Sequence, residues 1–373
     1  MKLSQEEAFA RIRLLRTSNV GPVTYRQMLV RFGSARAALD ALPDLAARGG
    51  RRRSPARREA IEEEIAALRA AGAKYLFHDD PTYPALLREL DSAPPILTIR
   101  GDQSLLSRPA VAMVGARNAS AAAMKLARGF AQELAGDGRL VVSGLARGID
   151  GAAHEGALAA DGDGGTCAVI AGGIDVAYPP QHEELQERIA NEGVLIAEQP
   201  PGVKPQARHF PSRNRIIAGL CAGTLVVEAA PKSGSLITAR IAGEAGREVM
   251  AIPGSPADGR ARGCNMLIRE GAILVQSAQD VAELLDSFTG DARSHFREEA
   301  VPFGGTVEDD TGFEDDADID IAALLSSAPV PVDDLIRASG ASAAAVQMAL
   351  LELELAGRLT RHAGGRVSVV EDI

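Results

Sequence analysis

The chain has 373 residues, of which 46% are hydrophobic and 3% aromatic, and its formal net charge is -10. A chain of this length is expected to form two or three soluble domains with a sizeable core. It has no run near the ~18 apolar residues of a membrane span and no basic-then-apolar start, so we expect a cytoplasmic protein without a membrane partner. The three cysteines are odd in number and far apart in the sequence, which argues against a disulfide framework or a zinc site and favours buried thiols.

The charge is unevenly distributed along the chain. Residues 1–80 hold 15 Lys and Arg against 10 Asp and Glu, a balance of +5, whereas residues 289–317 hold 2 against 9, a balance of -7. The acidity is therefore concentrated towards the end of the chain, and it does not exclude a nucleic-acid ligand for the rest.

Residues 1–75 are expected to form a small helical domain, because apolar residues recur at helical spacing in EEAFARIRLLRTS and RREAIEEEIAALRAAG. The segment NVGPVTYRQ between them resembles the turn of helix-hairpin-helix or sterile-alpha-motif-like modules. Two interpretations stay open for this domain: it contacts a nucleic-acid backbone through glycine-loop amides, or it is a helical cap in which Gly21 and Pro22 only form a turn.

From residue 80 to 288 the pattern is typical of a doubly wound, Rossmann-like parallel sheet. Short apolar runs, from AVAMVG at 110–115 to AILV at 272–275, alternate with helical segments. Ligands of such sheets bind outside the carboxyl ends of the strands. Glycines and cations follow these strands, and no G-x-G-x-x-G or P-loop motif occurs, so we expect a phosphate-binding crevice without dinucleotide or ATP chemistry. Its rim is predicted to carry Arg117, Arg147, Lys204, Arg213, Arg215 and Lys232.

The segment RHFPSRNRIIAGL at 208–220 is unusual because cations gather at the start of a helix, where the helix dipole is already positive. Pro211 is expected at the first helical position and Ser212 to Arg215 in the first turn. An anion in front of this turn would explain its charge. Phe210 beside these cations suits an unstacked base of single-stranded nucleic acid.

No catalytic triad or metal cluster can be assembled from the sequence, so neither a catalytic residue nor a metal or other cofactor is expected. His154 is interpreted as a hydrogen-bonded structural residue in preference to a base. Asp150, Glu198 and Glu228 lie near strand ends. They are expected to orient the arginines through charge-assisted hydrogen bonds, and a role as acid–base groups is the alternative.

Residues 318–373 are predicted to form three helices and a glycine-tipped hairpin, which is the pattern of a winged helix. They follow a flexible acidic linker at 289–317. The candidate recognition helix, 342–357, displays Glu352 and Glu354 and has no Lys or Arg. Such a surface would repel phosphate, so we expect a protein-contact or regulatory role for this domain.

Five motifs in consistent order resemble the DNA-processing protein A family (DprA, also called Smf): SGLARGIDGAAHEGAL, AGGIDVAYP, FPSRNRIIAGL, VVEAAPKSGSLITAR and PG followed by GCNMLIREGA. The resemblance covers roughly residues 80–288. It implies a non-catalytic protein that binds single-stranded DNA, forms homodimers through its Rossmann-like domain and loads the RecA recombinase during natural transformation. The family often carries a winged-helix tail.

The family motifs assign DNA-binding positions residue by residue. The matching residues are Arg117, Ser143, Arg147, Phe210, Arg213, Asn214, Arg215, Lys232, Ser233, Gly234, Ser235 and Thr238. Arg213 and Arg215 stand two positions apart and so point about 200° away from each other on an ideal helix. We therefore expect one of them to reach DNA and the other to pair with a carboxylate such as Glu198 or Glu228.

Two further questions stay open at the level of sequence. Residues 263–288, with Met266, Leu267, Ile268 and the run VAELL, either form the dimer interface or pack on their own sheet. Two functions compete with the DNA-binding one: a nucleotide-hydrolysing enzyme of the nucleoside-monophosphate phosphoribohydrolase type, and a winged-helix transcription regulator.

Overall fold

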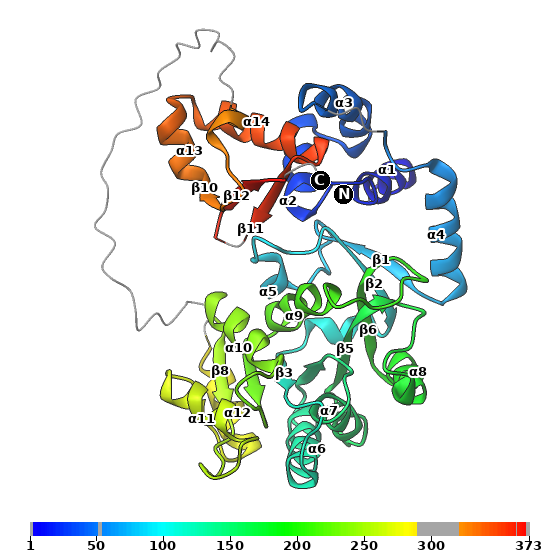
Figure 1. Cartoon of the computed structure of the whole chain (residues 1–373). Helices are drawn as coiled ribbons and strands as arrows, with labels where there is room; N and C mark the ends of the chain where they lie inside the picture. The colour runs from blue at the N-terminus through cyan, green and yellow to red at the C-terminus, as the bar shows by residue number, and fades with distance from the viewer. Residues whose placement is uncertain (1–2, 51–53, 289–320, 363, 371–373) are drawn as a thin grey trace. The chain divides into compact units, whose positions relative to one another are not determined.

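The computed structural model describes residues 3–50, 54–288, 321–362 and 364–370 (Figure 1). The chain divides into two compact units: Met1–Glu62 together with Arg297–Ile373, and Glu63–Phe296. The predicted acidic linker at 289–317 lies outside the described residues.

The larger unit is built on one sheet of nine strands in the order β1-β2-β6-β5-β4-β3-β7-β8-β9. The strands from β3 to β9 are parallel to one another, whereas β1 and β2 pair antiparallel at one edge. The strands are β1 Lys74–Phe77, β2 Ile96–Gly101, β3 Ala110–Val114, β4 Leu140–Ser143, β5 Gly165–Gly173, β6 Val194–Gln199, β7 Gly223–Val226, β8 Glu248–Ala251 and β9 Ile273–Leu274. The predicted Rossmann-like sheet is confirmed, and the antiparallel edge is an addition that the repeating pattern did not indicate.

Helices cover both faces of this sheet, as continuous apolar strands require. Val111 and Met113 of β3 pack on one side with α6 Ala121–Gly136, α7 Ile149–Leu158 and α12 Ala278–Asp286. Ala112 and Val114 pack on the other side with α5 Ala85–Arg88, α9 His209–Leu220, α10 Ser235–Glu244 and α11 Arg262–Arg269. A further cluster joins β5 and β6 to α8 Glu183–Glu192. All three cysteines are buried in the core, as expected.

The order of the strands places a switch point between β3 and β7. The chain moves outward from β3 through β4 and β5 to β6, and then returns to start β7 on the other side of β3. The loops that follow β3 and β7 therefore leave the sheet in opposite directions and open a crevice between them. This is where a ligand of a doubly wound sheet is expected.

The smaller unit combines the predicted helical domain with the predicted winged helix. Its first part contains α1 Gln5–Leu15, α2 Pro22–Phe32, α3 Ala35–Arg48 and the start of α4 Arg58–Ala70. Its second part contains η3 Ile321–Leu324, β10 Val330–Pro331, α13 Val332–Ser339, α14 Ala343–Ala356, β11 Leu359–His362 and β12 Arg366–Val369. The first of the three predicted helices is thus a single 3-10 turn, and β10 adds a third strand to the hairpin.

The candidate recognition helix α14 is largely occupied by contacts within its own unit. Leu351 and Leu355 lie in the core of the N-terminal helices. Glu352 and Glu354 pair with Arg48 and Arg361, at 3.8 and 2.8 Å. These contacts leave less of the helix surface available for reading a DNA groove, and the expected protein-contact or regulatory role stays a prediction.

No helix among the described residues is long and apolar enough to cross a membrane.

Candidate functional site

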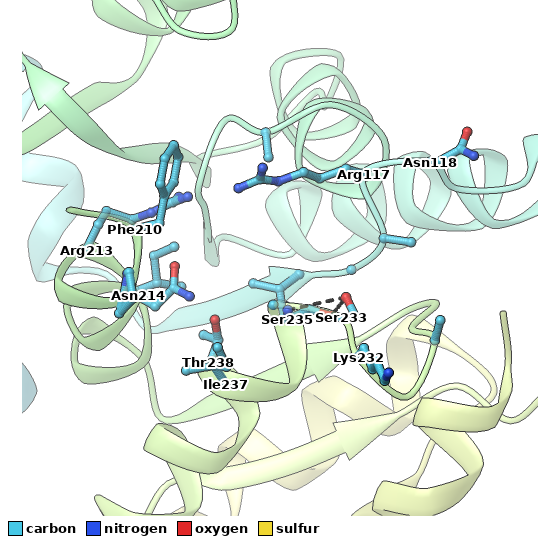
Figure 2. A pocket seen from close by; sticks show the side chains of 18 of the residues that line it. Arg117, Asn118, Phe210, Arg213, Asn214, Lys232, Ser233, Ser235, Ile237 and Thr238 are labelled. Carbon is cyan, nitrogen blue, oxygen red and sulfur yellow. Dashed lines mark hydrogen bonds between the residues drawn. The ribbon is translucent and has the colours of Figure 1, made fainter. Parts of the chain in front are cut away.

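A crevice of about 670 Å³ lies at the switch point of the sheet, between the loop after β3 and the loop after β7 (Figure 2). The start of α9 forms its third wall. Nine of the predicted site residues line it: Arg117, Phe210, Arg213, Asn214, Lys232, Ser233, Gly234, Ser235 and Thr238. Segments more than one hundred residues apart in the sequence thus meet at the predicted edge of the sheet.

The α9 wall begins two residues earlier than predicted. The helix starts at His209, so Pro211 occupies its third position. Its missing N–H costs nothing there, because the first four amides of a helix have no acceptor within the helix. The first turn carries Phe210 and Arg213 into the crevice, while Ile216 and Ile217 pack against the sheet below.

Arg213 is a buried cation, only 6% exposed. One guanidinium nitrogen donates to the Val169 carbonyl at 3.0 Å. Burial lowers the pKa of Arg213 to about 10, and the charge of the buried Asp150 opposes this shift. Gly144 makes room for the guanidinium, because a Cβ there would lie 1.5 Å from one of its nitrogens.

Arg215 pairs with Glu198 at 2.5 Å, with both side chains less than one-fifth exposed. The expectation that one of the two α9 arginines pairs with a carboxylate is therefore confirmed. Arg215 lies outside the lining of the crevice, so Arg213 is the α9 arginine that faces it.

Arg117 and Phe210 meet across the crevice. The Arg117 guanidinium carbon lies 5.0 Å from the centre of the Phe210 ring, a cation–π distance. In Figure 2 the Arg117 side chain extends from the β3 loop towards Phe210. The Phe210 ring also contacts Tyr178, with 5.8 Å between the ring centres. Together these side chains form a stacking surface flanked by positive charge.

The loop after β7 brings a cation and hydroxyl groups to the opposite wall. Lys232 precedes a turn in which the Ser233 and Ser235 hydroxyls lie 2.7 Å apart. Gly234 is the N-cap of α10, so the positive pole of this helix points into the crevice. Thr238, one turn further, also lines the wall.

Four of the thirteen predicted contact residues do not line the crevice: Arg215, described above, and Ser143, Lys204 and Arg147. Ser143 is fully buried, and its hydroxyl donates to the Met113 carbonyl at 2.6 Å. A ligand in the crevice therefore cannot reach this hydroxyl. The expectation of a DNA contact through Ser143 is corrected on this ground. Lys204 is exposed but does not line the crevice. Arg147 lies in a small side compartment next to the crevice.

Several lining residues were not predicted from the sequence. Tyr178 follows β5 in the quoted AGGIDVAYP motif, so its place at a strand end was a usable signal. Ile237 is 46% exposed in the crevice wall, and as an apolar residue it carries none of the charged or hydroxyl groups by which the contact residues were predicted. Arg260 comes from a loop after β8, and no pattern in the sequence places it at this wall.

The candidate acid–base groups are engaged in structural contacts. His154 Nδ1 lies 2.7 Å from the Thr166 hydroxyl, and burial lowers its pKa to about 3, so the ring is neutral. Asp150 accepts the amides of Gly144 and Ala146. Glu228 accepts the backbone and hydroxyl of Ser120 at the start of α6, and does not pair with an arginine. The structural interpretation of His154 is confirmed.

Among the described residues no group of His, Cys, Asp and Glu has the arrangement of a metal site. The crevice offers cations, helix-end amides and aromatic rings, which are groups that bind anions and stack on bases.

Comparison with known proteins identifies the family. Residues 74–286 match the family model of DNA recombination-mediator protein A, residues 5–67 that of the DprA-like N-terminal HHH domain, and residues 310–365 that of the DprA winged helix domain. The DNA processing protein DprA of Streptococcus pneumoniae is 49% identical over 202 residues, which cover 54% of this chain and 71% of that protein.

Two solved structures are similar to the chain. The X-ray structure of DprA from Streptococcus pneumoniae matches with a TM-score of 0.62 and 39% identity, over 76% of this chain and 98% of that one. DprA from Helicobacter pylori, whose structure describes its binding of single-stranded DNA, matches with a TM-score of 0.52 and 29% identity, over 58% and 97%. The match across all three regions shows that this chain belongs to the DprA/Smf family of DNA-processing proteins.

Proposed function

We propose that the protein binds single-stranded DNA through the crevice between the β3 and β7 loops, without strong sequence preference. One observation carries the proposal: Arg117 and Lys232 line the crevice, Arg147 lines the compartment next to it, and among the described residues no carboxylate forms an ion pair with these three cations. Unpaired cations beside a stacking surface are suited to phosphates and unstacked bases, and contacts of both kinds are independent of sequence.

Family membership supports a mediator role for this binding. We propose that the strand is presented to the RecA recombinase during DNA uptake and recombination, in the cytoplasm. The enzymatic alternative is disfavoured because His154, Asp150, Glu198 and Glu228 are all held in structural contacts, and no free acid–base pair lines the described part of the crevice. The transcription-regulator alternative is disfavoured because α14 packs within its own unit.

Homodimers are proposed to form through the Rossmann-like domain, at the edge where β9 ends the sheet. The VAELL run is not available for this, since Val281 and Leu285 are buried in the subunit's own core. Met266 and Leu274 are 37% and 46% exposed on the same edge. Two linked sites would hold a strand more firmly than one, through effective concentration.

Replacing Lys232 by alanine tests whether this crevice holds the strand. We expect weaker binding to all single-stranded sequences alike, and a log–log salt slope reduced by about one unit, because one phosphate contact is lost. Arg117→Ala should do the same. The measurement is fluorescence anisotropy with labelled oligonucleotides of two unrelated sequences across a series of salt concentrations.

Arg188→Ala is the matched control, because Arg188 is exposed on α8, outside the crevice, and its loss changes the net charge equally. It should leave the slope as in the unmodified protein. Unchanged slopes for Lys232→Ala and Arg117→Ala would place the DNA on another surface.

A further inference from the structure

A small side compartment adjoins the crevice, and Phe210 lines both. The volume of the compartment is about 60 Å³. It shares Arg117, Ala146, Phe210 and Arg213 with the crevice lining, and Arg147, Tyr178 and other residues complete its wall. A group at the end of a bound strand can therefore reach it directly from the crevice.

Three arginines, Arg117, Arg147 and Arg213, line this compartment. Among the described residues, the buried Asp150 offsets part of their charge, and it already accepts two backbone amides. Three positive charges around so small a space repel one another. An anion among them would remove this repulsion and gain charge-assisted hydrogen bonds.

The Arg213 side chain also has an unused donor. It is only 6% exposed, and its Nε is buried without a hydrogen-bond partner among the described residues. Buried donors are nearly always paired in folded proteins, so an unpaired one at the wall of a cavity indicates a missing acceptor. Gly144 allows this arrangement, because any side chain there would displace the guanidinium.

The size of the compartment restricts the acceptor. About 60 Å³ gives room for roughly four to six water-sized atoms at ~10–15 Å³ each. A phosphorus atom with its oxygens fills such a space, whereas a nucleobase is too large. The rings of Tyr178 and Phe210 are in contact and tilted by 56°, so they leave no slot between them for a base.

We propose that the side compartment binds a phosphoryl dianion, namely the terminal phosphate of a DNA strand that lies in the crevice. The proposal rests on the proposed function of the crevice. A phosphate inside a strand carries one negative charge and has chain on both sides, whereas a terminal phosphate carries about -1.5 to -2 at pH 7 and has chain on one side. The charge and the size of the compartment both match the terminal group.

The test compares oligothymidylates that differ only at one end. Competition anisotropy is measured with a 5′-phosphate, a 5′-hydroxyl and a 5′-phosphate methyl ester, and with the same three groups at the 3′ end. We expect the phosphate at one end to improve affinity about ten-fold over the hydroxyl, a change typical of hydrogen bonds to a charged group. The methyl ester has a single charge and extra bulk, and it should lose most of the gain.

Arg147→Gln is the decisive variant, because Arg147 is exposed and its replacement should not affect folding. It should bring the ratio of phosphate to hydroxyl affinity close to one. Lys232→Gln, on the opposite wall of the crevice, should weaken all ligands while keeping the ratio. Arg188→Gln on α8 should change neither.

The possible failures are distinguishable. Equal affinity for phosphate and hydroxyl ends, with single-strand binding intact, would overturn the side compartment alone. If the unmodified protein binds none of the single strands, the proposed function is overturned as well. If thymidine 5′-monophosphate competes as strongly as the phosphorylated strand, the ligand is a free nucleotide and the assignment to a strand end is wrong.

Discussion

Replacing Arg213 by methionine is expected to lower the free energy of unfolding by about 3–5 kcal/mol, the cost of leaving a buried charge without its counter-charge. The charge left behind is that of Asp150, whose pKa is raised by burial and lowered by the Arg213 guanidinium. The Val169 carbonyl would also lose its donor. Urea denaturation followed by circular dichroism measures the loss.

The pH dependence of this loss identifies its cause. Without Arg213 the pKa of Asp150 should rise further, so the folded protein holds a proton that the unfolded chain releases above about pH 4. Stability of the variant then falls as the pH rises from there to the raised pKa. The deficit relative to the unmodified protein should be smaller at pH 5 than at pH 7.5.

The double variant Arg213→Met with Asp150→Asn is the control, because it removes both charges. It should regain much of the lost stability and abolish the added pH dependence, as expected for interacting neighbours. A loss below about 1 kcal/mol in the single variant, the level of an exposed ion pair, would contradict the buried-charge explanation.

Replacing Phe210 by alanine is expected to cost about 1–3 kcal/mol of single-strand affinity, the range measured for stacking of a base on an aromatic ring. The salt slope should stay the same, because stacking releases no counterions. This combination differs from that of Lys232→Ala, in which affinity and slope change together. Anisotropy titrations at several salt concentrations give both quantities.

Two replacements of Phe210 separate stacking from packing. Phe210→Tyr keeps the ring and its contacts with Arg117 and Tyr178, so binding should stay near that of the unmodified protein. Phe210→Leu keeps apolar bulk without an aromatic face. Its loss of single-strand affinity should be almost as large as that of Phe210→Ala. Equal binding by the leucine and tyrosine variants, at equal melting temperatures, would exclude a stacking role.

The repeating sheet and the strand ends were readable from the sequence for a simple physical reason. Each parallel strand is buried on both faces, so it appears as a continuous apolar run, and a cation just after it must lie at the carboxyl edge. Arg117 and Lys232 were located in this way, and both line the crevice. The antiparallel strands β1 and β2 were not predicted, because they precede the alternating pattern of strands and helices.

The features of the site that could not be predicted depend on the direction of individual side chains and on contacts between residues far apart in the sequence. Ser143 is the last residue of β4, and its inward direction could not be read from a motif. The spacing of Arg213 and Arg215 predicted opposite directions, but the buried place of Arg213 depends on Gly144, about seventy residues earlier. Arg260 reaches the crevice only because a loop after β8 returns to it.

The most direct test of the account is the affinity of the unmodified protein for single strands against duplexes of the same length, measured by anisotropy across salt. The unpaired cations and the stacking surface predict preferential binding of single strands at moderate salt, with little difference between unrelated sequences and a steep salt dependence. Equal affinity for the two forms, or preferred binding to one duplex sequence, would contradict single-strand binding in the crevice.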